Sequence, residues 1–301
     1  MRLGITSLNY ARWFGEARPE ASGRLPLYFP TQSERVPQAE SLAWSIRKAR
    51  SLGVPVLADP IHRWREPGYV EAMADLAAAS GVEIEPWMAP NYMATGDEAK
   101  QVADTIVAFM RRVCRPLGAT ILGTAQVPML YHRWLESPSL AAQLERYAEN
   151  LRPVARAAES EGITLALENH CDYWAAELRQ LKEMVASPAL RFRLDTGNQW
   201  LVMEDPVRAA EVLADDVVTV HLKDVRIIPF CADGAKVVGA PLGRGHVDLR
   251  RILTILRERG VSPDTMPLVI ETSWTPSNED PARWTEESVL WARENLTEFL
   301  G

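Results

Sequence analysis

Four short apolar stretches in the second half of the sequence each carry a metal-binding type of side chain at or near their carboxyl end. In order, they read ITLALENH, RFRLDTGN, VVTVHLKD and PLVIETSW. Their metal-binding residues are Glu168, Asp195, His221 and Glu271. Each stretch has the length and near-continuous apolar character of a parallel strand buried on both faces. We therefore expect four neighbouring strands to bring these side chains together.

Three carboxylates held close together in a low-dielectric site repel one another unless a cation lies between them. A single acid at a strand end is often only a cap or an ion-pair partner. Four such residues at equivalent places in successive strands indicate a metal site. Oxygen ligands with one imidazole and no thiolate suit a six-coordinate, hard or borderline ion. We expect one divalent metal ion, Mn²⁺ first, with Mg²⁺, Co²⁺ or Zn²⁺ as alternatives.

The rest of the chain alternates between strand and helix patterns. Strands are predicted at residues 2–7, 54–58, 82–87, 119–125, 163–168, 190–195, 217–222 and 268–271. Helices are predicted at residues 38–52, 69–80, 97–117, 139–162, 174–186, 206–214, 248–259 and 285–300. Long loops are expected at residues 9–37 and 223–246, and Pro153 predicts a kink or break in its helix.

Eight strands, each followed by a helix, favour an α/β protein with one (β/α)8 TIM barrel over residues 1–301. The competing open, doubly wound sheet usually has a GxGxxG turn after its first strand, and this sequence has none there. Active sites of such barrels lie at the carboxyl ends of the strands. The predicted metal site lies at that end.

Five motifs together resemble the sugar phosphate isomerase/epimerase superfamily, which has a xylose isomerase-like barrel and includes ketose 3-epimerases and inosose dehydratase-like proteins. These motifs are LALENH, RLDTGN, VHLKDVR, PLGRGHVDL and LVIETSW. The resemblance implies a divalent metal, often Mn²⁺, bound by Glu168, Asp195, His221 and Glu271. It also implies that Glu168 and Glu271 are catalytic and move a proton from opposite faces of the substrate.

Four residues near these motifs are expected to bind the substrate. Arg226 resembles an arginine that contacts substrate oxygens in the ketose 3-epimerases. Those enzymes have a histidine three residues after the metal-binding aspartate, where this chain has Asn198. An amide can hydrogen-bond a hydroxyl but cannot titrate, and His170 from the neighbouring strand end is expected in the same space. Lys223 continues the polar run after the metal-binding histidine.

Weaker candidates lie elsewhere in the chain. The glycine-rich residues 243–246 precede a helix, so their amides either receive an oxyanion or form a turn. Trp13 and Phe14 either wall the site or pack beneath it. The residues that follow or end the first three strands are candidate pocket residues or local caps, namely Asn9, His62, Glu85 and Trp87.

Composition restricts the class of protein. A formal net charge of -7 argues against nucleic acid as a main partner, and no apolar run reaches the roughly 20 residues of a membrane span. The amino-terminal residues lack the apolar segment of a signal peptide, and the three cysteines have no CxxC spacing. We expect a cytoplasmic protein with reduced cysteines. Its partner is a small sugar or sugar acid, and fold analogy allows a homo-oligomer.

The predicted activity is metal-dependent isomerisation or epimerisation of a sugar, by proton transfer beside a carbonyl through a metal-bound enediolate. One alternative is a lyase or dehydratase acting on a keto-sugar or keto-inositol through the same enolate. Another is a non-catalytic metal-binding subunit of a complex. Phosphodiester hydrolysis normally needs several zinc ions and many histidines, and this chain has only five histidines.

Overall fold

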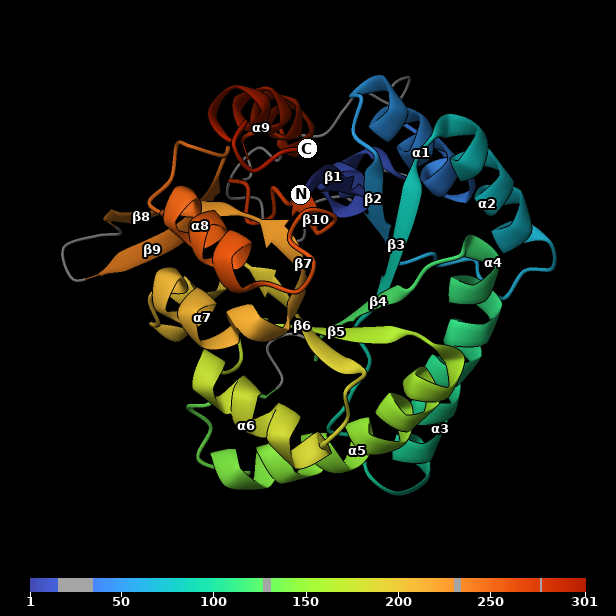
Figure 1. Ribbon diagram of the computed structural model, residues 1–301, viewed down its shortest axis with the longest axis vertical. Helices are drawn as coiled ribbons and strands as arrows, with labels where there is room; N and C mark the ends of the chain where they lie inside the picture. Colours follow the sequence, from blue (N-terminus) through green and yellow to red (C-terminus); the bar gives the residue numbers. More distant parts are fainter. Residues whose placement is uncertain (16–34, 127–130, 230–233, 277) are drawn as a thin grey trace.

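In the computed structural model, eight parallel strands close into a ring that helices surround (Figure 1). The structure describes residues 1–15, 35–126, 131–229, 234–276 and 278–301. The strands of the ring are β1 (Arg2–Thr6), β2 (Val56–Asp59), β3 (Glu83–Met88), β4 (Ile121–Thr124), β5 (Thr164–Glu168), β6 (Leu190–Asp195), β7 (Val217–Leu222) and β10 (Pro267–Ile270). Strand β10 pairs with both β7 and β1, which closes the ring. This is the (β/α)8 barrel that the sequence predicts.

The outer layer consists of the helices between the strands. They are α1 (Ser41–Ser51), α2 (Tyr69–Ser80), α3 (Gly96–Phe109), α4 (Arg115–Leu117), α5 (Leu140–Glu161), α6 (Ala175–Val185), α7 (Pro206–Leu213), α8 (Leu249–Arg259) and α9 (Pro281–Asn295). A π-helical segment, Met110–Cys114, joins α3 to α4. Within the described part of the chain, no helix is both long and apolar enough to cross a membrane.

The alternation of side chains along the strands produces two apolar layers. Val56 and Ala58 of β2 share one face and pack with Val269 of β10 and Trp87 in a small cluster of their own. Leu57, between them in sequence, joins the large core beneath the helices. The barrel is therefore packed on both faces of its strands, as the apolar strand sequences require.

Capping residues fix where several helices begin. Ser139, Asp205 and Asp280 each accept a hydrogen bond from a backbone N–H in the first turn of α5, α7 and α9. Asp248 caps α8 by accepting from the N–H of Arg251, at 3.0 Å. These oxygens satisfy N–H groups that have no partner inside their own helices.

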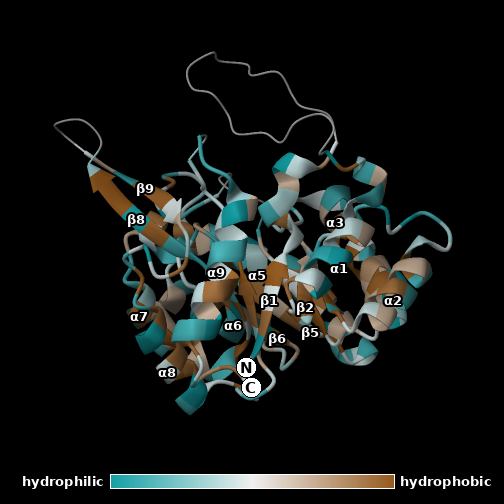
Figure 2. Ribbon diagram, turned by 90° about the horizontal axis from the view of Figure 1, so that it is seen from above, coloured by the Kyte–Doolittle hydropathy of each residue, from teal (hydrophilic) through white to brown (hydrophobic). Residues whose placement is uncertain are grey.

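The predicted loop at residues 223–246 is partly wrong. It contains an antiparallel hairpin of β8 (Asp224–Pro229) and β9 (Ala235–Ala240), and Figure 2 shows this hairpin projecting from the barrel. The β-branched residues Val225, Ile227, Val237 and Val238 favour strands. Pro229 sits at the end of a two-stranded sheet, where a missing N–H is tolerated.

Two predicted helices also differ from the structure. Helix α5 runs from Leu140 to Glu161 without a break, because packing of its buried face outweighs the hydrogen bond that Pro153 removes. Helix α9 begins at Pro281, not at residue 285, since proline suits the first turn of a helix. Of the predicted loop 9–37, Asn9 lies in a 3₁₀ helix, Ser7–Trp13, and residues 16–34 lie outside the described residues.

The cysteines that the structure describes, Cys114 and Cys171, are both free thiols. Cys231 lies outside the described residues. Burial raises the pKa of the Cys114 thiol to about 12, so this thiol stays protonated at neutral pH.

Candidate metal centre and adjoining pocket

The four predicted metal-binding residues lie together at the carboxyl ends of adjacent strands. Glu168 and Asp195 are the last residues of β5 and β6, His221 is near the end of β7, and Glu271 directly follows β10. One oxygen or nitrogen ligand atom from each lies within 4.8 Å of the others, and all four side chains are buried. The barrel thus brings together residues that are far apart in sequence.

Backbone hydrogen bonds hold Asp195 in place. Its Oδ1 accepts from the N–H of Gly197 at 2.8 Å and of Asn198 at 3.0 Å, so the turn after β6 orients the carboxylate. The side chain of Asn169 joins the ends of β5 and β6, because it donates to the carbonyl of Asp195 and accepts from its N–H. These contacts explain why an Asn and a Thr-Gly turn accompany the acids.

The contacts within the cluster leave buried polar atoms without hydrogen bonds. His221 Nδ1 lies 2.8 Å from Glu271 Oε2 and 3.5 Å from Glu168 Oε2. Among the described residues, neither ring nitrogen of His221, nor Oδ2 of Asp195, has a partner in hydrogen-bonding geometry. Buried polar atoms normally have such partners, and a metal ion would supply one for these atoms.

Two buried cations lie against the carboxylates. Lys223 Nζ lies 2.8 Å from Asp195 Oδ2 and 2.9 Å from Glu271 Oε1. Arg193 lies on the floor of the site, with Nη1 3.5 Å from Glu168 Oε2 and Nη2 2.5 Å from Glu85 Oε1. Arg193 and Glu85 are both buried inside the barrel.

The formal charge of this network is not balanced. Four carboxylates face two cations, which leaves two negative charges when the histidines are counted as neutral. Uncompensated buried charge is costly, and one divalent cation carries the charge that is missing. The donor set and the charge of the site therefore both fit a divalent metal ion.

The pKa shifts follow from burial and from these neighbours. Burial raises the pKa of Asp195 even though Lys223 lies beside it. Burial also acts to raise the pKa of Glu271, but the charge of Lys223 and the adjacent imidazole of His221 outweigh it, and the pKa lies well below its usual range. The pKa of Glu168 is lowered for the same kind of reason, mainly by His221.

A cavity of about 290 Å³ adjoins the cluster. Glu168, His221 and Glu271 form part of its wall, together with His170 and Arg193. Its remaining wall is Leu8, Trp87, Ala89, Thr124 and Ala125. The cavity is largely apolar with a few convergent polar groups, as small-molecule sites usually are.

Of the predicted substrate-binding residues, only His170 lines this cavity. Asn198 is fully buried and donates from Nδ2 to Glu168 Oε1 at 3.0 Å. Lys223 is also buried, and Arg226 is exposed on the hairpin strand β8. The structure thus places Asn198 and Lys223 behind the predicted metal-binding residues, and it does not place Arg226 in the cavity wall.

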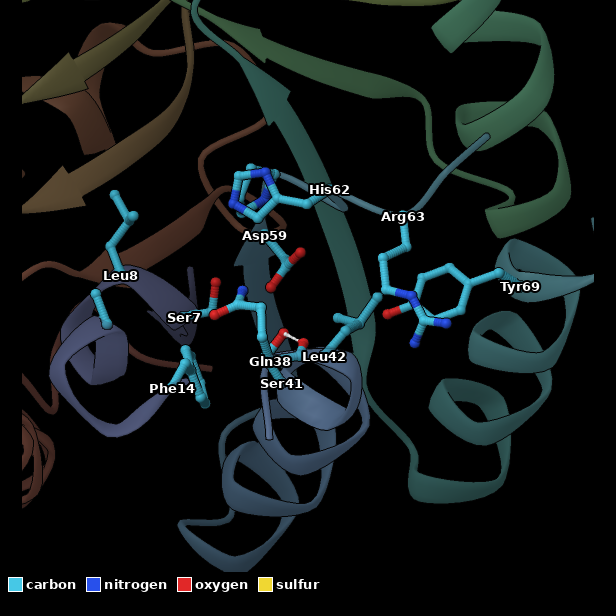
Figure 3. Close-up of a pocket in the computed structure, with 12 residues that line it drawn as sticks. Ser7, Leu8, Phe14, Gln38, Ser41, Leu42, Asp59, His62, Arg63 and Tyr69 are labelled. Atoms are coloured by element: carbon cyan, nitrogen blue, oxygen red, sulfur yellow. Dashed lines mark hydrogen bonds between the residues drawn. The ribbon is translucent and has the colours of Figure 1, made fainter. Parts of the chain in front are cut away.

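A second, smaller pocket of about 130 Å³ lies beside the first, and Leu8 borders both (Figure 3). It contains His62, which was expected near the site, and the buried carboxylate of Asp59 at the end of β2. Burial raises the pKa of Asp59, against hydrogen bonds from Ser7 and from the N–H of Ile61.

One of the weaker candidates lines the main cavity, and others make structural contacts. Trp87 lines the main cavity, whereas Asn9, in the 3₁₀ helix after β1, forms hydrogen bonds with Ile270 and Thr272 at the end of β10. Trp13 stacks on Trp44, and both rings pack against the main apolar core. The amides of Gly243 and Gly245 donate to the carboxylate of Asp224, so they are not available for an oxyanion.

Arg193 is the site residue that the sequence interpretation missed. It lies two residues before Asp195, on the same face of β6, so strand alternation could have placed it inside the barrel. Its partner Glu85 is 108 positions away in sequence, and no local pattern connects the two.

Comparison with known proteins gives consistent relatives. The sequence profile of the xylose isomerase-like TIM barrel family matches residues 46–295. The chain is 33% identical to 2-epi-5-epi-valiolone 7-phosphate 2-epimerase of Actinoplanes sp. over 198 residues. The matched region covers 61% of this chain and 67% of that protein.

Solved structures share the fold. D-psicose 3-epimerase from Clostridium cellulolyticum H10, crystallised with D-tagatose, superposes with a TM-score of 0.71 at 16% identity and 100% coverage of both chains. A xylose isomerase-like TIM barrel protein from Mycobacterium smegmatis, in complex with magnesium, gives a TM-score of 0.67 at 19% identity, covering 87% of this chain and 90% of that one.

Proposed function

The chain belongs to the xylose isomerase-like TIM barrel family, and we propose that it is a divalent-metal-dependent epimerase or isomerase of a small sugar or sugar-derived ketone. Its relatives are named epimerases, which supports an enzyme of the isomerase class. The metal ligands in this proposal are Glu168, Asp195, His221 and Glu271, with Mn²⁺ as the first expectation. When bound, a divalent ion supplies a Lewis acid that polarises a substrate carbonyl.

The observation that carries the proposal is the placement of two glutamates in one cavity. Glu168 and Glu271 come from strands separated by β6 and β7, and both carboxylates line the 290 Å³ cavity. His221 Nδ1 lies between them, 3.5 Å from Glu168 and 2.8 Å from Glu271. Two carboxylates on different sides of a bound ketone can remove a proton from one face and return one to the other.

The surrounding residues keep these carboxylates ionised and oriented. Arg193 and Asn198 contact Glu168, and Lys223 contacts Glu271. A carboxylate with a lowered pKa stays ionised at neutral pH, and only the ionised form can accept a proton. Trp87 and Leu8 contribute apolar wall to the cavity, which limits access of water to the carbon that loses its proton.

Turnover in D₂O tests the proposal. The probes are D-psicose, D-tagatose, D-fructose and L-ribulose, and 2-epi-5-epi-valiolone 7-phosphate as a phosphorylated ketone. Reaction through the glutamates should place solvent deuterium on one carbon beside the carbonyl, as detected by NMR. Glu168→Gln and Glu271→Gln should each lower kcat about 100-fold or more. Glu177→Gln, at a half-buried glutamate paired with Arg133 outside the cavity, is the matched control.

Different outcomes would point elsewhere. Loss of water from the probe, with an unsaturated product, would assign a lyase instead. Absence of deuterium together with near-normal kcat in either Gln variant of the site would exclude the two-glutamate mechanism.

A further inference from the structure

Lys223 is held as a structural part of the barrel. Its backbone N–H donates to Thr196 Oγ1 at 2.8 Å, and that hydroxyl donates to the Lys223 carbonyl at 2.7 Å. The side chain then runs inward and is only 3% exposed. These two hydrogen bonds join the ends of β6 and β7 and fix the backbone from which the side chain projects.

Three oxygens of the described residues surround the ammonium group of Lys223. Its contacts are Asp195 Oδ2 at 2.8 Å, Glu271 Oε1 at 2.9 Å and Asn198 Oδ1 at 2.9 Å. A lysine carries three N–H donors, and three oxygens surround it here. This geometry favours a role toward the carboxylates over the substrate-binding role expected from the sequence.

Lys223 shares two carboxylates with the proposed metal ion. Glu271 presents Oε1 to the ammonium and Oε2 to His221, so the two sides of this carboxylate face different partners. Oδ1 of Asp195 accepts from two backbone amides, so Oδ2, which lies 2.8 Å from Lys223 Nζ, is the oxygen left for a metal ion. A metal ion at the cluster would therefore lie close to a fixed positive charge and compete with it for one oxygen.

We propose that Lys223 is the built-in counter-ion of the metal centre: it stabilises the metal-free protein and weakens cation binding, so that the metal is exchangeable. The inference rests on the proposed metal-dependent function. It follows from Coulomb's law, because a positive charge a few ångströms away lowers the affinity for a second cation. It also follows from the charge of the site. With Lys223, the network carries two negative charges, which a divalent ion balances. Without Lys223, it would carry three, and it would attract a cation more strongly.

Trp274 supports this role from the other side. Its ring centroid lies 4.5 Å from Lys223 Nζ, close enough for a cation–π contact. The Trp274 backbone has a φ of 58°, and its carbonyl accepts from the N–H of Gly239 in β9 at 3.0 Å. The hairpin thus holds an aromatic face against the ammonium.

The test measures metal affinity and the stability of the metal-free protein. Lys223→Met removes the charge, Lys223→Gln removes the charge but keeps donors, and Lys223→Arg keeps the charge. In EDTA, the Met and Gln variants should melt below wild type. Their Kd for Mn²⁺, from calorimetry, should be about tenfold or more tighter than that of wild type, whereas the Arg variant should stay within about threefold.

Lys182→Met is the matched control. Lys182 is also largely buried and paired, with Asp216 at 2.9 Å, but it lies at the opposite end of β6 and contacts the carbonyl of Leu190. Its loss should lower the melting temperature without changing the Kd for Mn²⁺.

Each outcome decides the matter. Met and Gln variants that fold only with Mn²⁺ would support the proposal, because the metal then replaces the missing charge. An unchanged or weaker Kd, or failure to fold even with saturating Mn²⁺, would overturn it. Wild type that binds no divalent ion would instead refute the proposed metal-dependent function.

Discussion

Arg193 is the residue on which the floor of the site depends. Its guanidinium is 1% exposed and lies between Glu85 and Glu168. Gly123 on β4 leaves room for it, because a Cβ there would lie 1.7 Å from Nη2. The charge and the space of this position are therefore both fixed by neighbours from other strands.

Arg193→Met should destabilise the protein by about 3–5 kcal/mol, since it leaves two buried carboxylates without their cation. Urea unfolding at neutral pH measures the change. Arg191→Met is the control on the same strand, because Arg191 pairs with Asp216 at a half-buried position outside the site. Equal effects of the two substitutions would contradict the assignment of Arg193 as the counter-charge.

Asp172 predicts a pH dependence of stability. Burial, and then the charge of Glu168, raise its pKa to about 8, and its Oδ1 has no hydrogen-bond partner among the described residues. A carboxyl with a raised folded pKa contributes stability that is complete below its unfolded pKa and is lost as pH rises through the folded pKa. The free energy of unfolding should therefore fall between pH about 4 and about 8.

Asp172→Asn should remove this component. Urea titrations of the metal-free protein between pH 4 and pH 9 measure the free energy of unfolding at each pH. This free energy should fall less steeply with pH in the variant, by a slope that corresponds to at most one proton. His170 Nδ1, 4.0 Å from Asp172, is the nearest cationic candidate, so His170→Gln is the control. Identical pH profiles for wild type and the Asn variant would disprove the prediction.

For single residues, the sequence predicts the acids that stand at strand ends, but it does not predict the ion pairs that form between strands inside the barrel. Glu168 and Asp195 are visible because an apolar run stops at an acid. Arg193 and Glu85 lie within strands, and only the closure of the ring makes them partners. The neutral Asn198 was expected to face a substrate, but the adjacent strand ends surround it with Glu168 and Lys223.

Among the elements, the hairpin and the loop after it depend on one carboxylate. Asp224 accepts backbone hydrogen bonds from Gly243, Gly245, Val247 and Val225. A Cβ at position 245 would lie 1.9 Å from Asp224 Oδ1, so only glycine lets the loop approach this closely. The loop that the sequence suggested for anion binding is thus folded around an anion of its own.

Asp224→Asn should cost about 1.5–3 kcal/mol, because hydrogen bonds to a charged acceptor are lost and an amide N–H₂ then faces other donors. Hydrogen exchange should increase at residues 241–247. Asp248→Asn, at the cap of α8, is the matched control with little expected loss, since asparagine caps helices as well as aspartate does. A stable Asp224 variant with a protected loop would count against this account.

The elements that the sequence predicts well are those with a strong local pattern. Strands β6 and β7 begin and end at the predicted residues. The hairpin was missed because glycine and proline within it suggest a loop, and its pairing forms only between β8 and β9. Pro153 in α5 shows the same limit, since tertiary packing outweighs a local signal.

For the whole molecule, the negative charge of the site predicts that removing the metal lowers thermal stability. A ligand that binds only the folded state stabilises it by an amount that depends on its free concentration and its Kd. At free Mn²⁺ of about 100 times Kd, the gain is about 2.7 kcal/mol. Scanning calorimetry should show a lower melting temperature in EDTA and recovery on adding Mn²⁺. A melting temperature that ignores both treatments would contradict a metal bound at the buried cluster.

Strand β10 closes the ring between β7 and β1, with Arg2 opposite Pro267 and Ile5 opposite Ile270. Strand β10 is synthesised after β1, so the pairing of these two strands needs a partner about 265 positions downstream of β1. Contacts of such sequence separation form slowly. Glu271 follows that final strand, and a nascent chain therefore displays three of the four proposed ligands before it can enclose a cation. The proposed centre can therefore be completed only after β10 and Glu271 have been synthesised.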